Sequence, residues 1–358
     1  MWLGILLLPW RPWSSKLNLD VGPPSKKRSL SEVSALIPAR NEAALIQATI
    51  QALVDQGRDL RIILVNDQST DETVRRAVAV NHNLRVVHGQ PLPDGWSGKL
   101  WALEQGYQTV DTPYTLLTDA DIELTPGIIR SAMDKMEAEK IQLLSLMAQP
   151  HMQGFWEKLL MPAFVYFFKL LYPFKLSNTV HSRIAAAAGG FILLETRLLH
   201  ELGGFAEIKE ALIDDCALAR RVKTTHNKTW VGLSHSVRSL RCYTRLSDIW
   251  DMVARTAYTQ LYYSLGLLLL CTVIMLIGFL APLLGIWHPE AETRVMSVAA
   301  LLVMMATYLA ILQFYGRAKL WALALPLIGL LFLGMTWSSA IRYWKGNRAT
   351  WRDRTYRR

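Results

Sequence analysis

The sequence contains only three cysteines, Cys216, Cys242 and Cys271. Their spacing matches neither a zinc-binding motif nor a disulfide framework, which fits a reducing compartment. Glycine-rich nucleotide-binding loops are also missing, because neither a Walker loop nor a Gly-x-Gly-x-x-Gly fingerprint follows the first strand-like run. These absences argue against P-loop hydrolases and dinucleotide-binding enzymes, and also against nucleotidyltransferases with a glycine-rich first loop.

Charged residues nearly vanish from three apolar runs in the last third of the chain, which are Leu261–Trp287, Val295–Tyr315 and Leu320–Trp337. The first two exceed the ~20 residues that cross a ~30 Å hydrocarbon core. The third is of borderline length and carries Pro326. Buried core helices are the alternative, but three long runs in succession favour the membrane. We therefore predict a transmembrane region of about three helices over residues 261–341.

A strongly basic tail follows the last apolar run. The formal net charge of the chain is +10, and residues 342–358 supply +6 of it, with seven basic residues against one acidic residue. Nucleic-acid binding is one interpretation of such a tail. However, Tyr343, Trp344 and Trp351 interleave with the basic residues, as in segments attracted to anionic headgroups by ~1 kcal/mol per basic residue. We predict a juxtamembrane tail and no nucleic-acid partner.

Residues 1–29 are expected to lie outside the globular domain. The apolar stretch Met1–Pro9 is too short to cross a bilayer, and it lacks the basic start and cleavage site of a signal peptide. It is either the remnant of a longer anchor or a segment that lies in the membrane interface. The linker Pro23–Arg28 then marks the boundary before a domain that covers residues 30–260.

Residues 155–175 form an aromatic-rich apolar stretch inside that domain. Lys158 and Lys169 are eleven residues apart and share one face of a helix. This pattern favours an interfacial helix with its lysines toward the lipid headgroups, and a core helix of the domain is the alternative.

Short apolar runs alternate with helical periodicity from residue 33 to residue 147. The strand-like runs are 33–38, 61–66, 84–88, 114–118 and 142–147, and helical segments are expected at 43–56, 71–80, 99–110 and from 126. This alternation predicts an α/β fold with a parallel sheet covered by helices on both faces.

Acidic residues follow two of these runs and open a later helix. Asp67 follows one run, Asp119-Ala120-Asp121 follows another, and Asp214-Asp215 begins a helical stretch. Open α/β sheets bind ligands at the carboxyl ends of their strands. Two carboxylates that flank one residue can hold a hard divalent cation, which in turn holds a diphosphate. The pattern therefore predicts transfer of a group from a nucleotide to a membrane-soluble acceptor.

Six motifs occur in one order along residues 30–260: Pro38-Ala39-Arg40-Asn41-Glu42, Val65-Asn66-Asp67-Gln68-Ser69-Thr70-Asp71, Gly98-Lys99-Leu100-Trp101-Ala102-Leu103, Asp119-Ala120-Asp121, Ala188-Gly189-Gly190-Phe191 and Asp214-Asp215. Together they resemble the inverting family 2 glycosyltransferases of the GT-A fold, a Rossmann-like, mostly parallel sheet. The resemblance is strongest to the membrane glycosyltransferases associated with hopanoid (hopene) biosynthesis, which are related to ceramide glucosyltransferases.

This resemblance implies roles for individual residues. Asp215, with Asp214 as the second choice, stands where the family keeps its general base. Asp121 and Asp119 match the metal-binding pair, for which Mg²⁺ or Mn²⁺ is expected. The nucleotide-sugar site is expected to include Pro38, Ala39, Arg40, Glu42, Asp67, Lys99, Asp119, Ala120, Gly190 and Arg255. His235 is a candidate third metal ligand, but an ordinary loop histidine is the simpler interpretation.

The segment Met252-Val253-Ala254-Arg255-Thr256 departs from the family's processive members, which carry Gln-x-x-Arg-Trp here. The arginine remains, whereas the glutamine and tryptophan that position a growing polymer are absent. The resemblance therefore implies addition of a single sugar to a lipid.

The expected function is a membrane-bound inverting glycosyltransferase that uses a nucleotide-diphosphate sugar, expected to be a UDP-sugar, and a lipid acceptor, in hopanoid or other glycolipid biosynthesis. The alternatives are a polyprenyl-phosphate glycosyltransferase and a non-catalytic membrane scaffold that retains the fold. The expected location is a bacterial inner membrane with the catalytic domain in the cytoplasm. A basic tail after three spans would then lie outside, against the positive-inside tendency, so the sequence leaves the side of the tail open.

Overall fold

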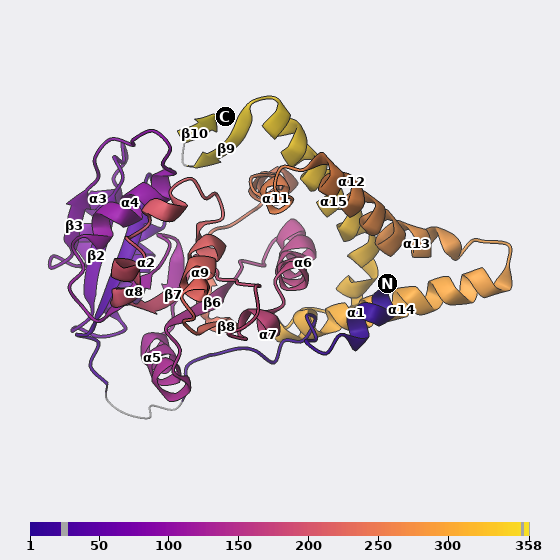
Figure 1. The fold of residues 1–358 in the computed structure, drawn as a ribbon, viewed down its shortest axis with the longest axis horizontal. Coiled ribbons are helices and arrows are strands. Elements are labelled where there is room, and N and C mark those ends of the chain that lie inside the picture. The colour runs from indigo at the N-terminus through magenta and orange to yellow at the C-terminus, as the bar shows by residue number, and fades with distance from the viewer. Residues whose placement is uncertain (23–27, 352–353, 358) are drawn as a thin grey trace. The chain divides into compact units, whose positions relative to one another are not determined.

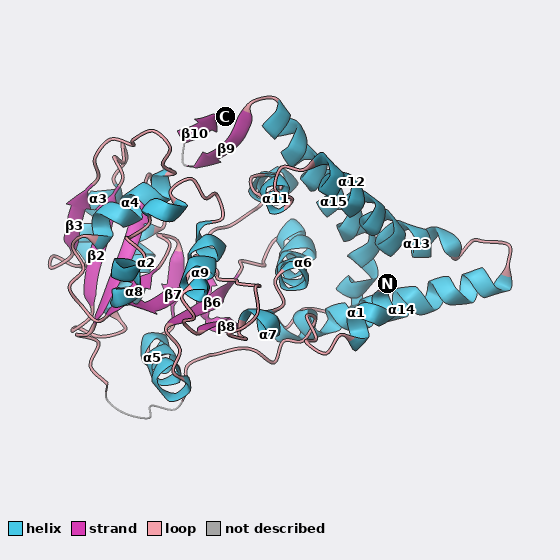
Figure 2. Ribbon diagram, in the orientation of Figure 1, coloured by secondary structure: helices cyan, strands magenta, loops and turns pink. Residues whose placement is uncertain are grey.

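The computed structural model describes residues 1–22, 28–351 and 354–357, with side chains up to residue 346. The chain divides into two compact units. The sheet unit comprises Leu17–Pro150 and Phe174–Arg241, and the helical unit comprises Met1–Lys16, His151–Pro173 and Cys242–Arg358. Figure 1 follows the chain through both units, and Figure 2 shows that the long strands lie in the first while helices dominate the second.

An eight-stranded mixed sheet forms the centre of the sheet unit, in the order β3-β2-β1-β4-β7-β6-β8-β5. Its strands are β1 Val33–Ala39, β2 Arg61–Asn66, β3 Arg85–His88, β4 Tyr114–Leu117, β5 Ile122–Leu124, β6 Leu143–Gln149, β7 Ile192–Glu195 and β8 Thr229–Ser239. Strands β3, β2, β1 and β4 are parallel neighbours, and β6 is parallel to β8. Strand β7 runs antiparallel to both β4 and β6, and β5 runs antiparallel to β8.

Helices cover both faces of this sheet because its strands are apolar on both sides. On one face, the core contains Ile37 of β1 together with residues of α2 (Ile46–Val54), α3 (Thr73–Val80) and α5 (Ile128–Glu139). On the other face, Leu36 of the same strand packs with α4 (Gly98–Tyr107), α8 (Thr196–Glu201) and α9 (Asp214–Thr224). The remaining short helices of the unit are α7 (Phe174–Ser177) and the 3₁₀ turn η1 (Ala206–Ile208).

The predicted strands and helices of residues 33–147 are confirmed within a few residues, and the strand 61–66 is confirmed at both ends. The mostly parallel sheet of the predicted fold class is confirmed, and the sequence did not indicate the two strands β5 and β7, which pair antiparallel. These two strands have three and four residues, so they are too short to show a hydrophobic period in the sequence. The sheet remains mostly parallel, as the fold class requires.

Three helical segments of the helical unit are long and apolar enough to cross a membrane: Leu265–Gly285, Ala291–Phe314 and Lys319–Trp344. They contain α12 (Leu265–Met275), η2 (Leu276–Leu280), α13 (Ala281–Gly285), α14 (Ala291–Phe314), η3 (Lys319–Ala324) and α15 (Leu325–Trp344). Pro326 lies in the first turn of α15, where its missing N–H costs no helical hydrogen bond. The third segment is therefore as long as the others despite its proline.

Helix α6 (Phe155–Leu171) packs within the helical unit through its aromatic side chains. Tyr166 meets Tyr308 of α14 with ring centroids 5.2 Å apart, and Phe167 meets Phe332 of α15 at 4.8 Å. The expectation that Lys169 faces the headgroups is wrong. Its side chain is buried and its ammonium donates to the carbonyl of Ser14, because Lys169 lies one turn after Val165 and Tyr166 on the buried face of α6.

The ends of the chain also belong to the helical unit. Helix α1 (Trp2–Leu7) inserts Trp2, whose Nε1 donates to the carbonyl of Gly278 at 2.7 Å. Helices α10 (Leu246–Ala254) and α11 (Ala257–Gln260) precede the apolar segments, and the antiparallel strands β9 (Asn347–Trp351) and β10 (Arg354–Arg357) follow them. The side chains of residues 347–358, and most of the linker Pro23–Arg28, lie outside the described residues, so the membrane attraction of the tail stays a prediction.

Candidate active site

A pocket in the sheet unit lies where β1 and β4 end and where α4 and α9 begin. Its lining contains four charged side chains, Lys99, Asp119, Asp214 and Asp215, together with the backbone of Gly189. Apolar residues close its remaining walls: Pro38, Leu100, Leu103, Leu117, Ile192, Phe205 and Leu218, with Thr118 at the end of β4. Both helices direct their N-terminal ends, and hence their positive dipole ends, toward this pocket.

Lys99 bridges two carboxylates across the pocket. Its Nζ lies 2.8 Å from Oδ1 of Asp119 and 3.0 Å from Oδ2 of Asp214. Burial alone would lower the pKa of Lys99, but these two carboxylates raise it above its ordinary value. Burial, together with the charge of Asp121, raises the pKa of Asp119 despite the neighbouring ammonium. The lysine is therefore a permanent cation at the centre of an acidic site.

Asp215 is held by backbone N–H groups. The amide of Gly189 donates to Oδ2 at 2.9 Å, and the amide of Cys216 donates to Oδ1 at 2.7 Å. Burial and the adjacent carboxylate of Asp214 raise the pKa of Asp215 to about 7, although Lys99 and the Cys216 amide lower it. A fixed carboxylate that exchanges its proton near neutral pH has the properties of a general base.

Gly189 permits this close grouping of charges. A Cβ atom at this position would lie 3.0 Å from Lys99 Nζ, 3.4 Å from Asp119 Oδ2 and 3.7 Å from Asp215 Oδ2. Any larger residue would therefore push into the space between the lysine and the two carboxylates. Gly190, which the sequence predicted to be part of the nucleotide-sugar site, has a packing role instead, because a Cβ there would meet Ile122 at 2.9 Å.

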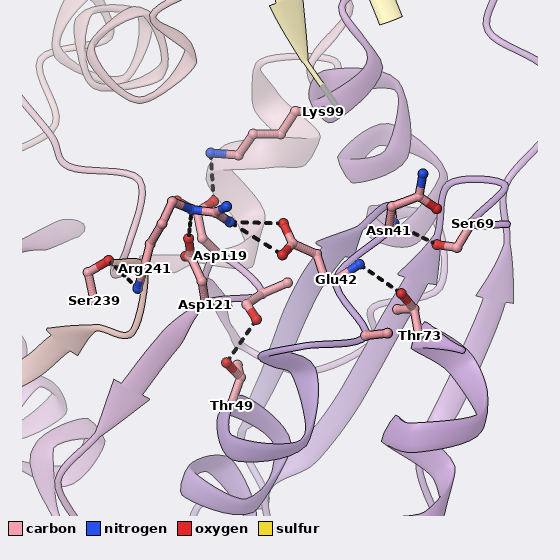
Figure 3. Close-up of polar contacts among 12 residues, drawn as sticks. Asn41, Glu42, Thr49, Ser69, Thr73, Lys99, Asp119, Asp121, Ser239 and Arg241 are labelled. Atoms are coloured by element: carbon pink, nitrogen blue, oxygen red, sulfur yellow. Dashed lines mark hydrogen bonds and ion pairs between the residues drawn. The ribbon is translucent and has the colours of Figure 1, made fainter. Parts of the chain in front are cut away.

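A second group of charges surrounds Asp121, beside the pocket. Figure 3 shows the guanidinium of Arg241 between the carboxylates of Asp121 and Glu42. Arg241 Nε donates to Asp121 Oδ2 at 2.6 Å, and Nη2 lies 3.1 and 3.3 Å from the two oxygens of Glu42. Sheet pairing places the arginine there, since Ile122 of β5 pairs with Ser239 of β8 and the amide of Leu240 donates to the Asp121 carbonyl.

A left-handed residue turns the chain after β1 and delivers Glu42 to this group. Asn41 has a φ of 52°, a conformation that asparagine adopts more readily than most residues. Its side-chain oxygen accepts a hydrogen bond from the backbone N–H of Thr70 at 2.9 Å. The backbone N–H of Asn41 donates to the hydroxyl of Ser69 at 3.1 Å (Figure 3). The asparagine and glutamate of the first motif therefore have distinct structural and electrostatic roles.

Further predicted residues of the donor site lie at the same ends of β1, β2 and β4. Asp67 is buried directly after β2, and its amide donates to the Ala39 carbonyl at 2.9 Å. Arg40 donates through Nη1 to the carbonyls of Asp67 and Gln68, at 2.8 and 3.2 Å. The Ala120 carbonyl accepts from Thr49 at 2.9 Å, which fixes the turn between Asp119 and Asp121, the two predicted metal ligands. Asp67 and Asp121 do not line the pocket that holds Asp215.

Two further residues that the sequence suggested for the site, His235 and Arg255, lie outside the pocket. His235 pairs with Asp20, with Nδ1 at 2.9 Å from Oδ2, so this histidine helps to fasten the N-terminal segment onto β8. Arg255 follows α10 in the helical unit, and its role with the diphosphate stays a prediction. Arg241 was not predicted from the sequence, because β8 was not recognised as the strand that brings it beside Asp121.

The acidic residues of the sheet unit suit a divalent cation. Carboxylate oxygens of Asp119, Asp121 and Glu42 are the hard donors that Mg²⁺ and Mn²⁺ prefer. The guanidinium of Arg241 already stands between two of them as a cation. Counted with Asp214 and Asp215, five carboxylates face the two cations Lys99 and Arg241, so three negative charges are in excess when all are ionised. An anionic diphosphate could approach such a site only with additional positive charge.

A different cluster, His151, Glu157 and Cys242, lies in the helical unit with its potential ligand atoms within 4.8 Å of one another. Glu157 is nearly fully buried and accepts the amides of Gln153, Gly154 and Tyr243 at 3.0, 2.9 and 2.7 Å. His151 Nδ1 completes the set at 2.8 Å. The carboxylate is thus already saturated by hydrogen bonds, and we regard it as an anchor for the start of α6.

Comparisons with known proteins identify a related family and a related fold. Residues 34–203 match the family described as Glycosyl transferase family 2. A curated relative, the 4,4'-diaponeurosporenoate glycosyltransferase of Staphylococcus aureus (strain USA300), is 36% identical over 91 residues, which is 25% of this chain and 24% of the relative. The protein of the same name from strain NCTC 8325 / PS 47 gives the same values. The chain thus matches only about a quarter of the length of these relatives.

Among solved structures, the mannosyltransferase PcManGT from Pyrobaculum calidifontis, in complex with GDP-Man and Mn²⁺, superposes with a TM-score of 0.59. The match covers 96% of both chains at 18% identity, so it shows likeness of fold alone. The family match includes Glu42 after β1, Lys99 at the start of α4 and the Asp119-Ala120-Asp121 turn after β4. Residues 34–203 therefore match a glycosyltransferase family 2 domain, and the sheet of this unit is of the GT-A type.

Proposed function

We propose that this protein is a membrane-bound inverting glycosyltransferase that moves one sugar from a nucleotide-diphosphate sugar to a lipid. The observation that carries the proposal is the pocket in which Lys99, Asp119, Asp214 and Asp215 meet around Gly189. The four charged side chains come from three separate segments of the sheet unit. A solvated surface turn would not gather them, whereas transfer of a sugar from a diphosphate requires both a base and a charged site for the leaving group.

The proposed reaction is a single displacement at the anomeric carbon. The acceptor hydroxyl loses its proton to Asp215 while its oxygen forms the new bond to the sugar. The bond between the sugar and the diphosphate breaks, and the nucleoside diphosphate leaves with the electron pair. Because attack and departure occur on opposite faces, the anomeric configuration is inverted. A positioned base contributes about 10²–10⁴-fold to such a step.

The other charged residues act on the donor. Asp121 and Asp119, with Glu42 beside them, would hold Mg²⁺ or Mn²⁺, which when bound stabilises the negative charge of the leaving diphosphate. Lys99 keeps Asp119 and Asp214 in place and adds a fixed positive charge to the pocket. Asp67 and Arg40, at the ends of β2 and β1, are proposed to contact the nucleoside.

The likeness to known proteins supports the choice of substrates. The fold neighbour from Pyrobaculum is described with GDP-Man and Mn²⁺, and the S. aureus relative is named for a carotenoid acid acceptor. This chain has three helices that are long and apolar enough to cross a membrane. We extend a nucleotide sugar, a divalent metal and a lipid acceptor to this chain, with a UDP-sugar as donor and a hopanoid or another glycolipid precursor as acceptor. We place the catalytic domain in the cytoplasm of a bacterium, where nucleotide sugars are made.

Membranes that contain the protein test the proposal directly. They are incubated with Mn²⁺ and radiolabelled UDP- or GDP-sugars, and the lipids are then extracted and separated. The proposed function predicts label in the lipid extract, and Asp215→Asn abolishes it at unchanged expression. Asp111→Asn serves as the control, because this exposed carboxylate pairs with Arg61 before β4, away from the pocket.

The chemical stability of the product distinguishes the alternatives. A sugar on a lipid hydroxyl survives mild acid, whereas a sugar on a polyprenyl phosphate is released. Binding of the nucleotide without any transfer or hydrolysis would instead favour a scaffold that retains the fold. Label in no lipid fraction with any donor would contradict the proposal.

A further inference from the structure

Asp121, one of the two predicted metal ligands, forms an ion pair with Arg241. Among the described residues, it is the predicted metal ligand that contacts an arginine. The guanidinium of Arg241 contacts Asp121 through Nε at 2.6 Å and Glu42 through Nη2 at 3.1 Å. Both carboxylates are largely shielded, with side-chain exposures of 13% for Asp121 and 10% for Glu42. At such low exposure, ion pairs are weakly screened by water and salt.

The position of Arg241 is fixed by the fold. The Leu240 amide donates to the Asp121 carbonyl at 2.8 Å. The residue before the arginine is thus hydrogen-bonded to the Asp119-Ala120-Asp121 turn itself. The β5–β8 ladder extends this attachment through Ile122 and Ser239. The guanidinium is therefore a cation tethered at the carboxylate that a divalent ion would need.

We propose that Arg241 competes with the divalent cation for Asp121, so that the metal binds tightly only together with the nucleotide diphosphate. This inference rests on the proposed function, and it adds an order to the binding of its ligands. A metal ion that arrives alone must displace the guanidinium and leave it without its carboxylate. A metal ion that arrives with a diphosphate brings phosphate oxygens, which are good bidentate partners for the displaced arginine.

Thermodynamic linkage gives this competition a measurable consequence. If the nucleotide offers Arg241 a new partner, the nucleotide strengthens metal binding, and the metal strengthens nucleotide binding by the same factor. Removal of the guanidinium should weaken this coupling. It should also raise the affinity for the metal alone, because the competing cation is gone and the two carboxylates keep their charge.

A purely structural role of Arg241 predicts the opposite. Loss of the guanidinium would then leave Glu42 and Asp121 as unpaired, repelling carboxylates and would disorder the site. Metal affinity would fall together with thermal stability. The sign of the change in metal affinity therefore separates the two roles.

The test is a titration of the purified full-length protein with Mn²⁺, followed by electron paramagnetic resonance, with and without UDP and, in parallel, GDP. We expect Arg241→Gln to bind Mn²⁺ alone about tenfold more tightly than the wild type, which corresponds to one unit of the logarithmic affinity scale. The nucleotide should strengthen Mn²⁺ binding less in this variant than in the wild type. Arg241→Lys keeps a cation that reaches only one carboxylate at a time, so an intermediate affinity is expected.

The control is Arg238→Gln, which removes an exposed arginine of the same strand and should leave Mn²⁺ binding unchanged. Equal or weaker Mn²⁺ binding in folded Arg241→Gln, whether or not its unfolding temperature falls, would overturn the inference and leave the proposed function intact. If Arg241→Gln does not fold, an Mn²⁺ affinity of Arg241→Lys no higher than wild type would overturn it. Absence of Mn²⁺ binding in every protein, with and without nucleotide, would contradict the metal-dependent function itself.

Discussion

The two units of the molecule each contain a shielded carboxylate that accepts backbone N–H groups, but the pKa values of the two move in opposite directions. Burial alone would raise the pKa of Glu157 in the helical unit, yet the amides of Tyr243 and Gly154 and the ring of His151 lower it below its ordinary value. In the sheet unit, burial and the charge of Asp214 raise the pKa of Asp215 to about 7.

The difference lies in the neighbours of each carboxylate. Glu157 is surrounded by donors and remains ionised, so it serves as an anchor. Asp215 has two amide donors but shares its pocket with Asp214 and Asp119, and the repulsion keeps its proton exchangeable. Burial alone therefore does not identify a reactive acid. A buried acid is identified as reactive by the other carboxylates beside it, which raise its pKa.

The largest effect is expected for Asp215→Asn. The amide keeps the shape of the side chain but accepts no proton, so we expect transfer to fall about 10²–10⁴-fold. The unfolding temperature should change little, because the loss of one acceptor for a backbone amide is offset by relief of the repulsion from Asp214. Lipid labelling in membranes measures the loss, with Asp111→Asn as the control. Activity within a factor of two of the wild type would remove Asp215 from its role and leave Asp214 as the candidate base.

Gly189→Ala should have the next largest effect. The added methyl group would lie 3.0 Å from Lys99 Nζ and 3.4 Å from Asp119 Oδ2, so one of these charges has to move. Displacement of reacting groups by about 1 Å can cost about 10²-fold in rate. The matched control is Gly22→Ala, whose Cβ would meet nothing within 4 Å. Equal activities of the two variants would show that the pocket tolerates a methyl group and is less tightly arranged than described.

The dependence of transfer on pH should sharpen the comparison further. The base acts in its ionised form, and its pKa is raised, so kcat/KM should fall about tenfold per unit as the pH drops below about 7. A rate profile between pH 5 and 9, measured at saturating Mn²⁺, checks this. An activity that stays constant down to pH 5 would mean that the raised pKa belongs to no group used in the reaction.

Glu157→Gln should change activity least and stability most. The variant loses an acceptor for buried amides, which costs about 1–3 kcal/mol of the free energy of unfolding. Because its pKa is lowered, Glu157 contributes stability above its ordinary pKa, and the contribution is lost as the pH falls through the folded value. A fall of several degrees in unfolding temperature is expected, with transfer per folded molecule unchanged at low temperature.

Glu290→Gln, an exposed acid of the same unit, is the control for Glu157→Gln and should leave the unfolding temperature unchanged. Loss of transfer in Glu157→Gln at an unchanged unfolding temperature would show that Glu157 is more than an anchor.

Much of the fold could be predicted because its signals are local. The strand 61–66 and the helix that begins at Asp214 follow from hydrophobic period and strand-end acids, and the three apolar segments follow from length and composition. The antiparallel strands β5 and β7 could not be predicted, since three or four residues carry no readable period. The burial of Lys169 depends on contacts far along the chain, with Ser14, that no helical pattern contains.

The candidate site was predicted in part for the same reason. The carboxylates and Lys99 stand in motifs with fixed spacing, and the structure brings Asp119, Asp214, Asp215 and Lys99 into one pocket. Arg241 belongs to no such motif. Only the pairing of β5 with β8 brings it to Asp121, which is 120 positions away in the chain. Gly189 rather than its neighbour Gly190 lines the pocket, a distinction that depends on the local path of the backbone.

The anomeric configuration of the lipid product tests the central claim most directly. The purified lipid can be characterised by mass spectrometry and by the proton coupling of its anomeric position in nuclear magnetic resonance. A single displacement assisted by Asp215 predicts one sugar per lipid, with the configuration inverted relative to the donor. A product with retained configuration, or a polymer of sugars, would contradict it.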